Sequence, residues 1–279
     1  MQSLSEIRAA LAERGLNPKK SLGQNFLVDQ NLGLKLVDAA SIGPGELVLE
    51  IGPGTGTLTG SLLERAGEVV ACEMDDGLFG LLGDRFAPEI EAGRLRLAHD
   101  DCLRDKRTLS EEITSRLAGR PFVHVANLPY AAATPVMLSL LADHPECRGV
   151  FVTIQREVAD RLEAGPGSKA YGAISVVAQC VGKVRRVGSL PSECFWPRPG
   201  VASAMIGIER LASPLTDDAR GLAEFCQRAF AGRRKQLGTL LKSMGFPDVP
   251  WPEGVEPTMR IEQLAPDRVS ALARACPGS

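Results

Sequence analysis

The feature that most constrains the fold of this chain is a regular alternation of strand-like and helix-like segments in its first half. Short apolar runs alternate with stretches of helical periodicity, and turns rich in Gly, Pro, Asn or Asp separate them. Such βα units pair in parallel and cover both faces of one sheet with helices. The strands expected here are 47–51, 69–72, 94–98, 122–126 and 149–154.

The segments on either side of this alternation complete the expected architecture. Two helices precede it, and residues 181–187 and 204–208 are expected to close the sheet as a pair of strands. From about residue 213 the strand signal stops and helical patterns follow. We therefore predict an α/β domain with a Rossmann-like sheet over residues 1–212 and a small all-helical domain over residues 213–279.

Two helix boundaries within the alternation are expected from single residues. Thr108 is followed by Glu111 at the spacing of a capping box, which predicts a helix from Thr108 to Leu117. The next helix is expected over Pro135–Leu141.

The composition is that of an ordinary globular protein: 44% of the 279 residues are apolar and 24% are charged. No stretch reads as a membrane span, and residues 1–15 do not read as a signal peptide.

The seven scattered cysteines, never spaced C-x-x-C, suit buried thiols in a reducing cytoplasm. With three unpaired histidines, no metal site is expected. The net charge of −2 argues weakly against RNA binding, although phosphate contacts depend on local patches.

A glycine-rich turn, E-I-G-P-G-T-G at residues 50–56, follows the first expected strand. Glycine lets the backbone approach a ligand with no Cβ in the way, so Gly52 and Gly54 are expected to contact a cofactor. Glu73, at the end of the next strand, is placed to accept hydrogen bonds from ribose hydroxyls. An NAD enzyme would need a third glycine where Thr57 stands, which favours S-adenosylmethionine. A purely structural turn is the alternative.

Two acidic residues, Asp100 and Asp101, follow the third strand. A carboxylate there can accept a hydrogen bond from an adenine amine. Asp101 is preferred because it directly precedes Cys102 and Leu103. Taken alone, an Asp after a strand is more often a helix cap or a solvated turn, but its place in the strand order favours the binding role.

The most informative motif is Asn127-Leu128-Pro129-Tyr130, directly after the fourth strand. The exocyclic amine of adenine is a poor nucleophile because its lone pair is delocalised into the ring. Two acceptors aimed at its two hydrogens, the amide oxygen of Asn127 and the carbonyl of Leu128, would draw that lone pair out of conjugation. Pro129 can leave this carbonyl free, and Tyr130 offers a flat face for the base. Positioning would supply most of the rate, without a strong general base. An ordinary turn is the alternative.

A loop before the last strand carries two aromatic rings. In Phe195-Trp196-Pro197-Arg198-Pro199, prolines stiffen a segment that would either clamp an extruded adenine or form a buried aromatic corner.

Basic residues gather at three places. Arg233, Arg234 and Lys235 lie within residues 228–242, which contain five basic residues and no acidic one. Such runs are usually solvated, but several around one pocket favour phosphate contact and affinity that falls with salt. The two smaller clusters are Lys19-Lys20, and Lys183 with Arg185 and Arg186.

In combination, these motifs resemble those of the ribosomal RNA adenine N6-dimethyltransferases, a family of class I S-adenosylmethionine-dependent methyltransferases. The resemblance runs from about Lys19 to the last helix. It rests on Gln24–Leu27, Glu50–Thr57, Glu73–Asp75, Asp101, Asn127–Tyr130 and Phe195–Ser203. The bacterial small-subunit (KsgA-like) branch is indicated by Gln155–Leu162, Pro166–Gly172 and Phe230–Lys235.

This resemblance implies a fold, a reaction and site residues. The fold would be a seven-stranded methyltransferase sheet with a C-terminal helical domain. The reaction would transfer four methyl groups to two adjacent adenines in the loop of the 3′-terminal helix of small-subunit (16S) RNA. The cofactor would contact Asn25, Leu27, Gly52, Gly54, Glu73, Met74, Asp101 and Asn127. The target base would lie against Asn127 and Tyr130, with Phe195 as a second stacking wall.

The chain departs from the family where Ala131-Ala132-Ala133 replaces the usual Asn-Ile-Ser, and in its slightly acidic charge. The expected partners are small-subunit RNA and 30S assembly intermediates, bound by a cytoplasmic monomer. Four alternatives stay open: a large-subunit RNA dimethyltransferase, a DNA amino-methyltransferase, a non-catalytic assembly or nucleic-acid-binding protein on the same fold, and an NAD-dependent oxidoreductase.

Overall fold

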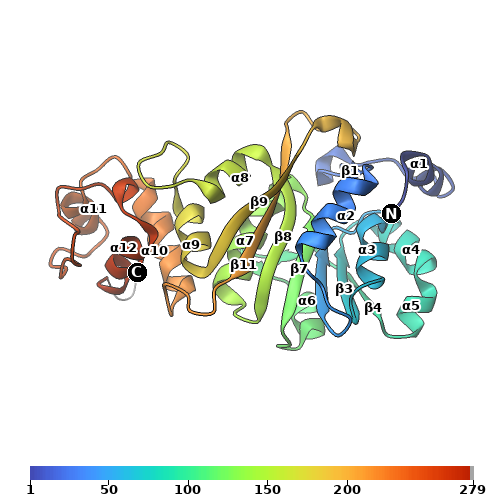
Figure 1. Cartoon of the computed structure of the whole chain (residues 1–279), viewed down its shortest axis with the longest axis horizontal. Helices are drawn as coiled ribbons and strands as arrows, with labels where there is room; N and C mark the ends of the chain where they lie inside the picture. Colours follow the sequence, from blue (N-terminus) through green and yellow to red (C-terminus); the bar gives the residue numbers. More distant parts are fainter. Residues whose placement is uncertain (277–279) are drawn as a thin grey trace.

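The centre of the molecule is one mixed seven-stranded sheet, seen in a computed structural model that describes residues 1–276 (Figure 1). In spatial order its strands are β4 (Leu95–His99), β3 (Glu68–Glu73), β2 (Leu47–Ile51), β7 (Phe122–Asn127), β8 (Cys147–Gln155), β11 (Ser203–Arg210) and β9 (Gly182–Leu190). The first five are parallel, and β11 runs antiparallel to both of its neighbours. The predicted Rossmann-like α/β sheet is confirmed.

Helices cover both faces of this sheet, as expected for parallel strands that are buried throughout. Apolar side chains of α2 (Gln30–Ala39), α3 (Thr57–Leu63) and α4 (Asp76–Arg85) form one buried cluster with the sheet. On the other face lie α6 (Glu111–Leu117), α7 (Tyr130–Asp143), α8 (Arg156–Glu163) and α9 (Ala173–Val181).

Short elements line the edges of these layers. At the N-terminal side they are α1 (Leu4–Ala12), the 3₁₀ turn η1 (Lys20–Leu22), β1 (Phe26–Leu27) and α5 (Ala87–Glu91). A hairpin of β5 (Leu103–Arg104) and β6 (Thr108–Leu109) precedes α6, and η2 (Ser192–Cys194) leads into β10 (Phe195–Trp196), which pairs with β1.

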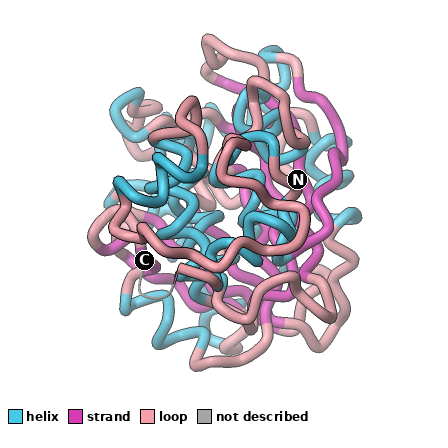
Figure 2. The backbone as a smooth tube through the Cα atoms, turned by 90° about the vertical axis from the view of Figure 1, so that its left-hand side faces the viewer, coloured by secondary structure: helices cyan, strands magenta, loops and turns pink. Residues whose placement is uncertain are grey.

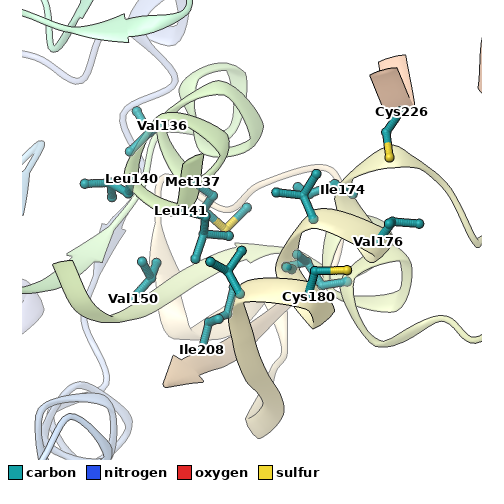
Figure 3. Packing of buried hydrophobic residues seen from close by; sticks show 14 of the residues in the cluster. Val136, Met137, Leu140, Leu141, Val150, Ile174, Val176, Cys180, Ile208 and Cys226 are labelled. Atoms are coloured by element: carbon teal, nitrogen blue, oxygen red, sulfur yellow. The ribbon is translucent and has the colours of Figure 1, made fainter. Parts of the chain in front are cut away.

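The C-terminal segment is helical, as predicted. It consists of α10 (Ala219–Ala231), α11 (Leu237–Ser243), η3 (Ile261–Gln263) and α12 (Pro266–Arg274). Seen from that end of the molecule, helices and loops lie in front of the strands (Figure 2). Its apolar residues join the cluster on the α7 face, and Cys226 of α10 lies near Ile174 of α9 in Figure 3. One core therefore runs across the boundary predicted at residue 213.

Two predicted helix starts are wrong. Thr108 lies in β6, and the N-cap of α6 is Ser110, whose hydroxyl accepts the N–H of Ile113 at 3.4 Å, because the hairpin takes up the residues before it. Helix α7 begins at Tyr130 with Pro135 inside it. Pro135 removes a single helical hydrogen bond, the one to the carbonyl of Ala131, and the buried face of α7 compensates for that loss.

None of the helices within residues 1–276 has the length and apolar character needed to cross a bilayer.

Candidate active site

A cavity of about 450 Å³ opens beside the carboxyl ends of β2, β3, β4 and β7. The strand order reverses between β2 and β7, and open α/β sheets bind their ligands at such a point. The wall includes residues 21–27 of the N-terminal segment, the glycine-rich turn, the ends of β3 and β4, and residues 127–132. Every cofactor-binding and catalytic residue predicted from the sequence lies on this wall.

The glycine-rich turn needs glycine for its conformation and for its packing. Gly52 and Gly54 have φ of +69° and +62°. A Cβ on Gly52 would lie 3.3 Å from the ring of Pro129, and one on Gly54 would lie 3.0 Å from the ring of Phe26. Any other residue at these two positions would be strained and would also push against the neighbouring segments.

The N-terminus holds this turn through a contact that the sequence did not reveal. The side-chain oxygen of buried Gln2 accepts hydrogen bonds from the hydroxyls of Thr55 and Thr57, at 2.8 and 2.9 Å. The carbonyl of Thr55 also accepts a bond from Arg85 at 3.0 Å. The turn is therefore fixed from two sides.

Two buried carboxyl groups lie on the floor of the cavity. Glu73 accepts the N–H groups of Gly54 and Asp75 at 3.2 and 3.0 Å, and two acceptor positions of a carboxylate stay available for ligand hydroxyls. Burial raises the pKa of Glu73. Glu50 accepts the hydroxyl of Thr59 at 2.7 Å, and burial raises its pKa to about 8, so it carries a proton at neutral pH.

The end of the cavity near β3 and β4 combines an apolar side chain with acidic ones. Met74 lines the cavity and is 48% exposed, which suits packing against a planar ligand. Asp101 is exposed, and its Oδ1 accepts the N–H of Leu103 at 3.1 Å. This contact belongs to the turn before β5 and is not a helix cap, and the carboxylate retains capacity for another donor.

Asn127 is held rigidly at the cavity wall. Its Nδ2 donates to the carbonyl of Asn25 at 2.8 Å, which fixes the orientation of the amide because a carbonyl can only accept. Its Oδ1 accepts the hydroxyl of Thr153, the residue opposite it in the pairing of β7 with β8. An amide oxygen has two lone pairs, so one of them is still available.

The carbonyl of Leu128 completes this corner. No group within residues 1–276 donates a hydrogen bond to it, because the N–H groups of Ala132 and Ala133 both bond the carbonyl of Pro129. Next to it, the hydroxyl of Tyr130 lies 2.6 Å from that of Ser203. Two oxygen acceptors and an anchored aromatic ring therefore meet at one place on the wall.

The structure does not bring Phe195 to the cavity. Its side chain is 2% exposed and joins the buried cluster with Leu27, its partner in the pairing of β1 with β10. Trp196 stacks on Phe26, with ring centroids 6.2 Å apart. Of the two interpretations of this segment, the structure has the buried aromatic corner, because pairing with β1 turns Phe195 inward.

Arg233, Arg234 and Lys235 line a second cavity, of about 860 Å³, together with Lys169 and Arg260. Arg233 is engaged there: it lies 3.5 Å from a carboxylate oxygen of Glu262 and donates to the carbonyls of Lys169 and Tyr171. The other four basic residues are exposed, and none of them has a carboxylate within 4 Å in residues 1–276.

Three of the five residues in the two smaller basic clusters have acidic partners. Lys19 pairs with the buried Asp75 at 2.6 Å. Arg185 pairs with Glu209 at 2.9 Å, and Arg186 contacts both Asp160 and Glu163. Lys19, Arg185 and Arg186 thus have acidic partners from distant parts of the sequence, and phosphate contact by these two clusters stays a prediction.

Several residues of the site were not predicted from the sequence. Thr153 is a polar residue inside the apolar run of β8, and that interruption was a usable signal. Gln2, Ser203 and Lys106, which also lines the first cavity, gave no comparable signal. Within residues 1–276, no group of three or more His, Cys, Asp or Glu side chains is arranged to hold a metal ion.

Comparisons with known proteins identify the family of this chain. Residues 15–275 match the profile of a family described as ribosomal RNA adenine dimethylase. Ribosomal RNA small subunit methyltransferase A of Nocardia farcinica is 42% identical over 276 residues, covering 93% of this chain and 90% of that protein. The protein of the same name from Magnetococcus marinus is 37% identical over 281 residues, covering 98% and 97%.

Solved structures add agreement on the fold. A dimethyladenosine transferase from Plasmodium falciparum has a TM-score of 0.65 at 26% identity, covering 78% of this chain and 74% of that one. The 23S rRNA methyltransferase ErmE has a TM-score of 0.63 at 21% identity, covering 90% and 99%, and thus shares the fold. With a family match over almost its whole length and relatives near 40% identity, the chain belongs to the ribosomal RNA adenine dimethylase family.

Proposed function

We propose that this enzyme uses S-adenosylmethionine to dimethylate the N6 amines of two adjacent adenines in the 3′-terminal helix loop of small-subunit (16S) ribosomal RNA. The observation that carries the proposal is the corner at Asn127 and Leu128. Two oxygen acceptors, one rigidly held and one without an internal donor, lie on the wall of a cavity at the switch point of the sheet. Membership of the adenine dimethylase family supports an adenine as their substrate.

The charges around the cavity support the cofactor. Glu73, Asp100 and Asp101 line it together with the protonated Glu50, and Lys106 is the one basic residue among the lining residues described. A dinucleotide would bring an anionic pyrophosphate into this acidic surrounding, whereas S-adenosylmethionine has a sulfonium and an ammonium group. When bound, this cofactor supplies an electrophilic methyl group on its sulfur.

The residues proposed to hold the cofactor divide between its two ends. Asn25, Leu27, Gly52 and Gly54 surround the part of the cavity next to the glycine-rich turn, where the methionine portion would lie, with Asn127 close by. The free oxygen positions of Glu73 would accept the ribose hydroxyls. At the other end, the exposed Met74 would pack on the adenine ring, and Asp101 would accept its amine.

The chain's contribution to the reaction is to orient the target amine. Asn127 Oδ1 and the Leu128 carbonyl would accept its two hydrogens, which draws the nitrogen lone pair out of the ring. Pro129 keeps the second acceptor outside the helix, and Tyr130, anchored by Ser203, would stack on the base. The product amine is cationic and loses its proton readily to water, so no side chain needs to act as a strong base. Thr153 is a positioning residue that holds Asn127.

The second cavity is proposed to hold RNA phosphates. Arg234 and Lys235, with Lys169 and Arg260, have no carboxylate within 4 Å among residues 1–276 and present their charges there. Arg233 instead binds Glu262 and two backbone carbonyls, which holds the surrounding segments together. We further infer that the enzyme acts on 30S assembly intermediates as a monomer in the cytoplasm. The names of relatives at 37–42% identity, all small-subunit methyltransferases, favour this substrate over large-subunit RNA.

Transfer of radiolabelled methyl groups tests the proposal. Purified enzyme is incubated with small subunits that lack the modification, with large subunits as the control, and the modified bases are mapped. Label is expected on two adjacent adenines of the small-subunit RNA alone. Labelling of large-subunit RNA would favour the alternative branch, and absence of transfer to either subunit would favour a non-catalytic assembly role.

A further inference from the structure

The hairpin of β5 and β6 forms part of the rim of the first cavity. Its turn is closed by a hydrogen bond from the N–H of Arg107 to the carbonyl of Arg104, at 3.2 Å. The two central residues, Asp105 and Lys106, have φ of +57° and +56°. Turns of this kind usually contain Asn or Gly, so a lysine there is unfavourable for the backbone. This strained turn carries the side chain that lines the cavity.

Among residues 1–276 the ammonium group of Lys106 has no hydrogen-bonding or ion-pair partner. Arg104 pairs with Glu111 and lies 3.6 Å from Asp105, so the nearest carboxylates of the hairpin are already engaged. No carboxylate of residues 1–276 lies within 4 Å of the Lys106 ammonium. Lys106 is exposed, and it is the only basic residue among those found to line the cavity.

The surroundings of Lys106 offer nothing else to an anion. Strand β6 packs against α7, whose residues Ala131, Ala132 and Pro135 form the neighbouring cavity wall with small apolar side chains. In the N-terminal segment Lys19 is bonded to Asp75, and the exposed Lys20 is not among the residues that line the cavity. Among the residues described as lining this cavity, Lys106 at the hairpin tip is therefore the one cation that an anion would meet.

We propose that Lys106 binds a backbone phosphate of the RNA beside the target adenine, as an RNA contact distinct from the second cavity. The inference rests on the proposed function, because an adenine placed at Asn127 and Tyr130 necessarily brings the phosphates on either side of it to the rim. Lysine suits this contact: its ammonium is a point charge on a flexible stem and needs no fixed donor geometry.

Three variants of the hairpin test this inference. Lys106→Met removes the charge, Lys106→Arg keeps it, and Arg107→Met removes the adjacent charge, which is exposed but does not line the cavity. Affinity for a synthetic stem-loop with two adjacent loop adenines is measured between 50 and 200 mM KCl. Affinity for S-adenosylmethionine is measured by calorimetry.

Lys106→Met is expected to weaken RNA binding about fivefold and to reduce the salt slope by about 0.7, the value for one single-strand phosphate. Lys106→Arg should restore both, Arg107→Met should stay within about twofold of wild type, and cofactor affinity should be unchanged. The inference is overturned if Lys106→Met binds RNA like wild type, if Arg107→Met loses as much, or if cofactor affinity falls instead. Methyl transfer by the wild-type enzyme tests the proposed function separately.

Discussion

The polar side chains that form this site lie at or just after the ends of buried strands. Two of them, Asn127 and Tyr130, are each held in place by a hydrogen bond to a residue of another strand. Asn127 is fixed by Thr153, and Tyr130 by Ser203. Asn127 and Tyr130 stand in a motif whose chemistry could be predicted from the sequence. Their partners could not, because the pairing of β8 and β11 with the rest of the sheet sets which hydroxyl faces which acceptor.

Glu50 lines the cavity and also makes the stability of the protein depend on pH. The pKa of Glu50 is near 4.5 in the unfolded chain. Complete burial raises this pKa to about 8 in the folded protein. Between these two pH values the folded state holds a proton that the unfolded state has released. The contribution of Glu50 to stability is therefore present below pH 4.5 and is lost as the pH rises through about 8. Glu50→Gln removes the titration and should lose less stability than wild type as the pH rises.

The comparison is best made between pH 6.5 and 8. Burial lowers the pKa of His124 to about 4, so below its ordinary value of 6.5 this residue adds a pH dependence of the opposite sign. Above pH 6.5 His124 is neutral in both states. Thermal unfolding across this interval should show the difference between Glu50→Gln and wild type moving in favour of the variant. A difference that stays constant would contradict the account of Glu50.

At the scale of elements, the connection between α10 and α11 gives neighbouring arginines different roles. Arg233 contacts Glu262 and two carbonyls of the α8–α9 connection, whereas Arg234 is exposed with no carboxylate nearby. Arg233→Ala should lower the free energy of unfolding by about 1 kcal/mol, since it loses one half-exposed ion pair and two hydrogen bonds. Arg234→Ala should leave stability unchanged and weaken RNA binding.

Chemical denaturation and RNA binding at several salt concentrations measure the two effects. Arg234→Ala is expected to reduce the salt slope by about 0.7 without a change in the denaturation midpoint. The assignment fails if Arg233→Ala proves as stable as wild type, or if Arg234→Ala retains the full salt slope.

Most elements of the sheet could be predicted because their apolar runs are long and punctuated by turn residues, as at 47–51 and 122–126. The predictions that were wrong concern places where a tertiary contact overrides the local preference of the sequence. The hairpin of β5 and β6 displaces the cap from Thr108 to Ser110, and burial of one face of α7 carries the helix through Pro135. Phe195 was expected at the cavity, but pairing of β10 with β1 buries it.

At the scale of the whole molecule, charge and core are both organised around the sheet. Despite the net charge of −2, Lys106 and the exposed basic residues around the second cavity have no carboxylate within 4 Å among residues 1–276, whereas Lys19, Arg185 and Arg186 pair with acidic residues. The C-terminal helices share one apolar cluster with α7 and α9 (Figure 3). This continuous core joins the proposed phosphate-binding segment to the helix that begins at Tyr130.

The most direct test of the central claim is the single-turnover rate of methyl transfer for Asn127→Ala, at saturating S-adenosylmethionine and small subunits. Removing the oriented amide oxygen should lower this rate at least about 10²-fold. The variant should still fold, with an unfolding temperature somewhat below that of wild type because two hydrogen bonds are lost. Thr153→Val, which removes only the hydroxyl that holds this oxygen, should lose an intermediate factor of about 10. Wild-type turnover by folded Asn127→Ala would contradict the claim that this corner activates the target amine.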